Sequence, residues 1–143
     1  MTFPIDRIEC FYRTILQKEA AQICQNYLAD EKTYVFVEGP RYSTLGYSQI
    51  ARGWQDFCAS ALELESIEWV EGPFTEAAAD LAWVAGMVVL TVTVNGQRIQ
   101  RQFRTTFVLR QDEAGDWKLR HEHVSAPLDD PYGIGDWLKP KKA

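Results

Sequence analysis

The strongest constraint on the fold is a pair of long β-rich segments joined by Asn95-Gly96. Residues 81–94 and 97–110 are rich in β-branched and aromatic side chains, and Asn-Gly strongly favours a two-residue type I′ hairpin turn. A turn at these two residues predicts the cross-strand pairs Val84 with Phe107, Val88 with Phe103 and Val92 with Ile99. One face of the hairpin is then apolar and the other is mixed, so an antiparallel sheet is expected to carry the fold.

Helices are predicted before this hairpin. Apolar residues recur every three or four positions in residues 5–17 and 19–28, and again in a segment that begins near Ser48, a plausible N-cap. Residues 33–38 indicate a short strand and the segment 39–46 a loop. From Leu64 onward the pattern predicts strands, and Gly72-Pro73 is expected to bend or interrupt the first of them. A last strand is expected over residues 117–125. The order of helices and strands predicts an α+β fold.

Length and composition exclude several classes of protein. The chain has 143 residues, 46% of them hydrophobic, which fits one globular domain with a substantial core. A formal charge of -5 argues against nucleic-acid binding, and the longest apolar stretch is too short for a membrane helix. The N-terminus lacks the pattern of a signal peptide, and the three cysteines form no CxxC pair. A cytoplasmic protein with reduced thiols is expected.

The last strand carries both histidines of the chain. Simple alternation puts Trp117, Leu119, His121, His123 and Ser125 on one side, which should join the apolar face of the hairpin because Trp117 and Leu119 favour burial. Two registers remain open. One sets Phe107 opposite His121 and Thr105 opposite His123, whereas a one-residue slip sets the histidines beside Arg104 and Thr106.

The candidate functional residues follow from this placement. An imidazole in a partly apolar cavity can exchange a proton near neutral pH, which makes His123 the candidate general acid/base, although a structural hydrogen-bonding role is the alternative. Tyr12 and Trp54 could line a ligand pocket or simply belong to the core. No third residue accompanies His121 and His123 at a metal-ligand spacing, so no metal site is expected.

Several short motifs are ordered as in one known superfamily. They are Gly39-Pro40, Gly46 with Ile50 and Gly53-Trp54, residues 80–84, residues 106–110, and Gly115-Asp116-Trp117 leading to His123 and Ser125. Over residues 5–127 the chain resembles the nuclear-transport-factor-2-like superfamily, in its SnoaL-like branch. The resemblance implies a cone-shaped roll in which a curved antiparallel sheet wraps around N-terminal helices and leaves an internal pocket. It also implies that the outer sheet face can form a homodimer.

The same resemblance frames the expected function. Relatives include ketosteroid isomerase, polyketide cyclases and non-catalytic association domains, so fold alone does not select an activity. The isomerases and cyclases use a pocket Asp as base, whereas the last strand of this chain offers His123 and Ser125. We expect a cone domain over residues 1–127 and a tail over residues 128–143.

The leading hypothesis is a binding domain for a small apolar or anionic organic molecule, without a cofactor. Its contacts are expected to come from Tyr12, Trp54, Arg104, His121, His123 and Ser125. The alternatives are an isomerase, dehydratase or cyclase that uses His123, or a non-catalytic oligomerisation module. A homodimer is expected through the mixed face of the hairpin, which bears Trp83, Met87, Gln102, Arg104 and Thr106.

Overall fold

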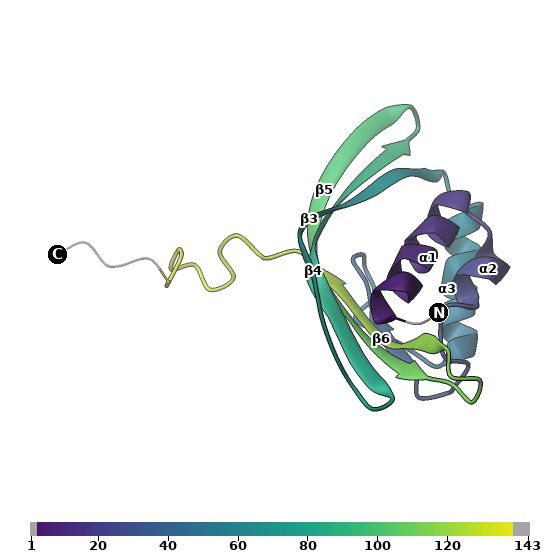
Figure 1. Ribbon diagram of the computed structural model, residues 1–143. Coiled ribbons are helices and arrows are strands. Elements are labelled where there is room, and N and C mark those ends of the chain that lie inside the picture. Colours follow the sequence, from purple (N-terminus) through teal and green to yellow (C-terminus); the bar gives the residue numbers. More distant parts are fainter. Residues whose placement is uncertain (1–2, 139–143) are drawn as a thin grey trace.

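A computed structural model of the chain describes residues 3–138. The helices are α1 (Pro4–Gln17), α2 (Ala20–Cys24) and α3 (Tyr47–Ala59). The strands are β1 (Tyr34–Phe36), β2 (Thr44–Leu45), β3 (Leu62–Ala78), β4 (Leu81–Val94), β5 (Gln97–Gln111) and β6 (Trp117–Ser125). One six-stranded sheet has the order β2-β1-β6-β5-β4-β3, and it curves around the three helices, which lie on its concave side (Figure 1). The predicted α+β cone is confirmed.

The hairpin forms as predicted, but the sheet is mixed. Val88 pairs with Phe103 and Val84 with Phe107, as the Asn95-Gly96 turn requires. The expectation of a wholly antiparallel sheet is wrong in one place, because β1 runs parallel to β6. Strand β2 lies within a segment predicted to be a loop, and α2 is shorter than predicted because the chain leaves the helix to pair with β6 at Tyr27.

The long strand β3 bends where it crosses β4. Its pairing register shifts three times, between Leu64 and Ser66 and twice more around Glu71, so Gly72-Pro73 distorts the strand without ending it. Gly86 of β4 lies under this bend. A Cβ on Gly86 would collide with the carbonyl oxygen of Glu71 and lie 2.8 Å from the ring of Trp69. The absence of a side chain at Gly86 therefore lets β3 fold closely over β4.

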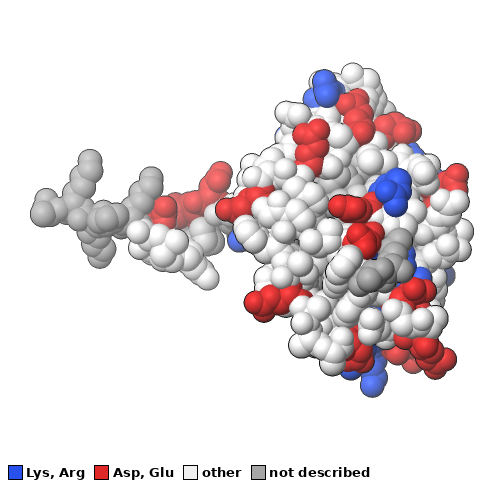
Figure 2. Space-filling model, in the orientation of Figure 1, with Lys and Arg blue, Asp and Glu red and all other residues white. Residues whose placement is uncertain are grey.

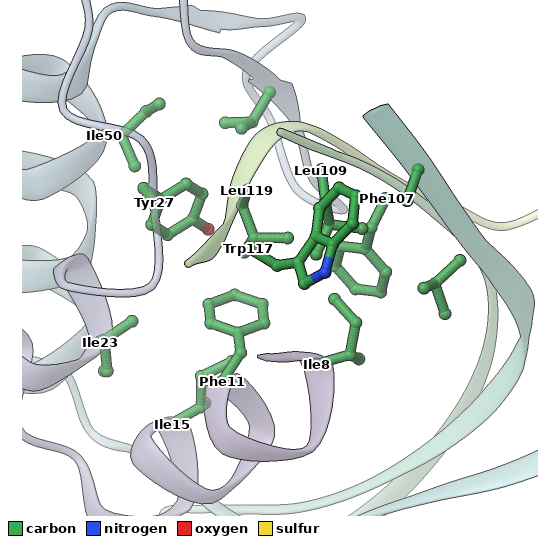
Figure 3. Packing of buried hydrophobic residues seen from close by; sticks show 13 residues of the cluster. Ile8, Phe11, Ile15, Ile23, Tyr27, Ile50, Phe107, Leu109, Trp117 and Leu119 are labelled. Carbon is green, nitrogen blue, oxygen red and sulfur yellow. The ribbon is translucent and has the colours of Figure 1, made fainter. Parts of the chain in front are cut away.

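The core lies between α1 and the middle of the sheet. Phe11 of α1 is fully buried, and its ring makes edge-to-face contacts with Tyr27 at 5.4 Å, Trp54 at 5.8 Å and Phe107 at 6.0 Å between ring centroids. Figure 3 shows Phe11 pointing from α1 toward the sheet, with Leu119, Trp117 and Leu109 above it in the view. These contacts fix the helices against the sheet and leave its far end, toward the hairpin turn, uncovered by core residues.

One bulge in β6 decides which of its side chains face inward. His121 pairs with Val108, but the next pair along is Leu119 with Leu109, so Arg120 is an extra residue on β6. Trp117 and Leu119 point into the core before the bulge. After it the alternation is inverted, and Glu122 points inward with an exposed fraction of only 4%.

The described part of the segment after β6, residues 126–138, contains no helix or strand. Residues 126–138 extend away from the convex side of the sheet (Figure 1), and acidic side chains are visible along them in Figure 2. On the face of the body that Figure 2 shows, acidic and basic side chains are interspersed. None of the helices within residues 3–138 is both long and apolar enough to cross a membrane.

Candidate functional site

A cavity of about 780 Å³ opens between the helices and the concave face of the sheet. Its wall is mostly apolar and comes from both layers, with Ile15 and Phe57 on the helices and Ile67, Leu90 and Phe103 on the strands. The volume lies within the range of about 300–1,000 Å³ that is typical of small-molecule sites. The space exists because the aromatic core fills only one end of the cone.

A buried carboxyl group lies in the wall of this cavity. The Tyr27 hydroxyl donates a hydrogen bond to Glu122 Oε1 at 2.5 Å, and Trp54 Nε1 donates to the Tyr27 hydroxyl at 3.1 Å. Tyr27 is held beside β6 by the backbone, since Leu28 N donates to the Leu119 carbonyl and Leu119 N donates to the Asn26 carbonyl, each at 2.8 Å. The chain after α2 thus behaves as an extra short strand that positions this tyrosine.

Glu38, which follows β1, is a second acidic side chain in the cavity wall. Water in the open cavity reaches Glu38, but protein surrounds the carboxyl group on most sides, and this burial raises its pKa to about 7. Burial raises the pKa of Glu122 to about 7 as well, with a further contribution from Glu38, while the bond from Tyr27 opposes the rise. The two carboxyl groups titrate as an interacting pair near neutral pH.

Two hydroxyl groups accompany the carboxyl pair. Tyr12 of α1 lines the cavity, and burial together with the charges of Glu122 and Glu38 raises its pKa, so the phenol stays a neutral donor. The hydroxyl of Thr105 is close enough to Tyr12 to oppose this rise, yet it makes no hydrogen bond of normal geometry within the described residues. A buried hydroxyl of this kind is available to a bound molecule.

The predicted site residues separate onto the two faces of the sheet. Tyr12 and Trp54 line the cavity, whereas Arg104, His121, His123 and Ser125 do not. The prediction that His123 faces the cavity is wrong, so the structure gives no support to the acid/base role built on that placement. The β6 bulge is the physical reason, because it turns His121, His123 and Ser125 to the convex face. Neither of the two registers left open is found, because His121 pairs with Val108 and His123 with Thr106, while Arg104 pairs with Ser125.

The convex-face residues form a cluster of their own. Arg104 donates from Nε and Nη2 to the Ser125 hydroxyl at 3.2 and 3.1 Å. The His121 ring stacks on Tyr34, and the His123 ring meets Phe36 edge-to-face at 4.6 Å. Burial, His121 and Arg104 all lower the pKa of His123, which favours the neutral imidazole. No group of three or more potential metal ligands occurs in the part of the chain that the structure describes.

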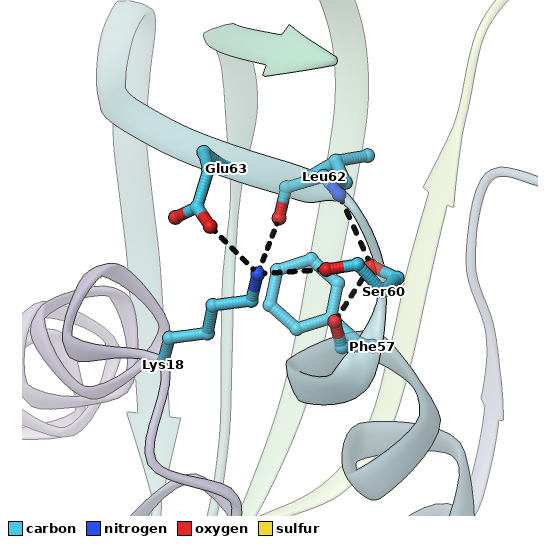
Figure 4. Close-up of polar contacts among 5 residues, drawn as sticks. All are labelled: Lys18, Phe57, Ser60, Leu62 and Glu63. Carbon is cyan, nitrogen blue, oxygen red and sulfur yellow. Dashed lines mark hydrogen bonds and ion pairs between the residues drawn. The ribbon is translucent and has the colours of Figure 1, made fainter. Parts of the chain in front are cut away.

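The end of α1 is tied to the rim of the cavity by Lys18. Its ammonium group donates to the carbonyl oxygens of Ser60 and Leu62 at 3.0 and 2.8 Å and forms an ion pair with Glu63 at 3.1 Å (Figure 4). Because Phe57, Ser60 and Leu62 line the cavity, this contact fixes α1 relative to the junction of α3 and β3.

Glu38 and Glu122 are the residues that sequence reasoning missed. Alternation from Trp117 assigned Glu122 to the outer face, and Glu38 stood at the end of a short strand with no motif around it. One signal was available for Glu122. Three polar side chains in succession, at His121, His123 and Ser125, on an otherwise buried face indicated that the alternation changes after Leu119.

Comparison with solved structures shows the same fold in other proteins. A nuclear transport factor 2 (NTF2-like) superfamily protein from Salmonella enterica serovar Typhimurium superposes with a TM-score of 0.78 at 19% identity, over 92% of this chain and 93% of that one. A ketosteroid isomerase-like protein from Erwinia carotovora superposes with a TM-score of 0.72 at 16% identity, over 85% of this chain and 93% of that one. An NTF2-like protein of unknown function from Pseudomonas putida superposes with a TM-score of 0.68 at 22% identity, over 94% of this chain and 92% of that one.

Sequence comparison identifies the family. Among curated proteins, none matches the chain. The family model of the SnoaL-like domain matches residues 6–129, which include every helix and strand of the cone except the first two residues of α1. The chain therefore belongs to the SnoaL-like domain family, within the NTF2-like fold.

Proposed function

We propose that this protein binds a small, mostly apolar organic molecule in the cavity, with one polar group of that molecule directed at Glu122, Tyr12 and Thr105. The observation that carries the proposal is the cavity of about 780 Å³, whose apolar wall is interrupted by a buried carboxyl group. Burying a carboxyl group costs free energy, and folding stability alone gives no reason to keep Glu122 inside. A ligand that accepts or donates a hydrogen bond there gives such a reason.

Filling the cavity tests this proposal. Ile67 of β3 lines the cavity, whereas Val70, three residues later on the same strand, is exposed. We expect the neutral fluorophore N-phenyl-1-naphthylamine to bind the wild-type protein, and Ile67→Trp to weaken its binding about tenfold or more, since the indole occupies the ligand's space. Val70→Trp, the matched control, should bind as the wild type does. Fluorescence titration measures both. Equal binding by both variants, or no binding by the wild type, would contradict the proposal.

A second candidate function is proton transfer on a bound ketone or similar carbon acid. It is favoured by Glu38, whose pKa of about 7 and open contact with water suit a general base, and by the Tyr12 and Thr105 hydroxyls nearby. The solved structure of a ketosteroid isomerase-like protein has the same fold, which supports this candidate but assigns no substrate. This candidate replaces His123 with Glu38 as the proton-accepting residue.

We further propose that the convex face joins two copies of the chain. Trp83 on this face is 38% exposed and lies among half-buried Met87 and Val108, which is more apolar surface than a free sheet face needs. Sedimentation at micromolar concentration should give twice the chain mass of 16.4 kDa. Met87→Glu should give the monomer, while Leu16→Glu, on exposed surface of α1, should leave the dimer intact. A wild-type monomer would overturn this proposal.

A further inference from the structure

Arg101 is a cation on the concave face of the sheet, where every neighbouring inward position is apolar or carries a hydroxyl. Inward-facing residues of β5 alternate along the strand, and between the two terminal residues Gln97 and Gln111 they are, apart from Arg101, Ile99, Phe103, Thr105, Phe107 and Leu109. Arg101 pairs with Leu90 across the hairpin and lines the cavity at its open end. An arginine at such a position is not explained by core packing.

Three acidic side chains of α3 and β3 are paired with cations other than Arg101. Glu63 is bound by Lys18 at 3.1 Å, Glu65 by Arg98 at 3.1 Å, and Asp56 by Arg41 at 3.8 Å. Within residues 3–138, Arg101 has no carboxylate partner. Its one hydrogen bond runs from Nη1 to the carbonyl oxygen of the adjacent Gln100 at 2.9 Å, which leaves most of the five guanidinium N–H donors free.

We propose that Arg101 binds the anionic group of an amphipathic ligand whose apolar body lies in the cavity. This inference rests on the proposed function and names its ligand class: an organic anion with a carboxylate, sulfonate or similar group at one end. A guanidinium group recognises such groups through two parallel hydrogen bonds. The apolar side chains of Phe103 and of Val88, its pair on β4, lie between the cation and the polar end of the cavity.

The geometry also sets the length of the ligand. Arg101 and Thr105 are four residues apart on β5, and at about 3.3 Å per residue their Cα atoms are separated by roughly 13 Å. Thr105 marks the polar end, with Tyr12 and Glu122 close to it. The ligand class is therefore an elongated molecule with an anion at the mouth, an apolar middle and a second polar group inside. Negative charge at the inner end is disfavoured by the carboxyl pair there.

Two fluorophores that differ by one charged group test the inference. 1-Anilinonaphthalene-8-sulfonate carries a sulfonate on the same ring system as neutral N-phenyl-1-naphthylamine. Arg101→Gln should weaken binding of the sulfonate about fivefold and leave binding of the neutral compound unchanged, because only the ion pair is lost. The control is Arg98→Gln, which removes a cation from the outer face of the same strand, and it should change neither affinity. Added salt should weaken the binding of the sulfonate and leave the binding of the neutral compound unchanged.

The possible results separate this inference from the proposed function. If neutral N-phenyl-1-naphthylamine binds and is excluded by Ile67→Trp, but Arg101→Gln leaves the sulfonate's affinity unchanged, the anion site is overturned and the cavity remains a binding site. If Arg101→Gln weakens the binding of both fluorophores equally, the anion site is also overturned. If Ile67→Trp excludes neither fluorophore, the proposed function itself fails.

Discussion

Between pH 5 and pH 8, the free energy of unfolding should fall by about 2 to 3 kcal/mol less in Glu122→Gln than in the wild-type protein. The cause is the rise of the Glu122 pKa from 4.5 to about 7 on folding, which follows from its burial. Glutamine has the shape of the protonated acid and can still accept the hydrogen bond from Tyr27. The variant therefore keeps the packing but has no proton to lose.

The direction of the effect follows from proton binding. Below pH 4.5 both the folded and the unfolded chain hold the proton, and Glu122 does not make stability depend on pH. Between pH 4.5 and about 7 the unfolded chain releases the proton while the folded chain retains it, so the free energy of unfolding falls. Above about 7 both states are ionised, and the loss is complete.

Urea denaturation at pH 5 and pH 8 measures this difference. Glu38 contributes in the same direction in both proteins, so the difference between variant and wild type reports Glu122 together with its interaction with Glu38. Glu113→Gln, in the exposed turn between β5 and β6, is the matched control and should leave the pH dependence unchanged. If Glu122→Gln lost as much stability as the wild type over this range, the assignment of a neutral buried acid at this position would be wrong.

The main frame of the fold could be predicted because its signals are local. The Asn95-Gly96 turn determines every pair of the β4–β5 hairpin, and the apolar spacing in α1 determines which side of that helix is buried. The superfamily resemblance added the cone. Strand β2 and the parallel pairing of β1 with β6 could not be predicted, since three-residue and two-residue strands depend on distant partners rather than on a pattern of their own.

The candidate site was harder to predict, because one inserted residue controls it. The alternation of side chains along a strand predicts their direction only while the pairing is regular. Because Arg120 is an extra residue, the side chains of β6 after it face the opposite side of the sheet from the one that alternation predicts. The same bulge that removes His123 from the cavity places Glu122 there. Tyr12 and Trp54, for which the sequence leaves both a pocket and a core position open, line the cavity, and a strand bulge does not affect such helical positions. Whether they bind a ligand is part of the proposal.

If the cavity supports proton transfer, Glu38→Gln should slow exchange of a bound ketone's α-protons about a hundredfold or more. In the proposed step, the ionised Glu38 removes a proton from the carbon beside the carbonyl group. The resulting enolate oxygen accepts hydrogen bonds from the Tyr12 and Thr105 hydroxyls, and Glu38 returns a proton to the same carbon. Because Glu38 is open to water, its proton exchanges with solvent between these two transfers.

Exchange of 2-decalone protons in deuterated water, followed by NMR, measures this rate. The enzyme-dependent rate should rise as pH increases through about 7 and then level off, because only ionised Glu38 accepts the proton. Glu113→Gln should exchange at the wild-type rate, and Ile67→Trp should abolish exchange by excluding the ketone from the cavity. A wild-type rate no faster than that of Glu38→Gln, or a rate without the pH step, would restrict the cavity to binding, because a base that titrates near 7 must impose that step on any reaction it carries.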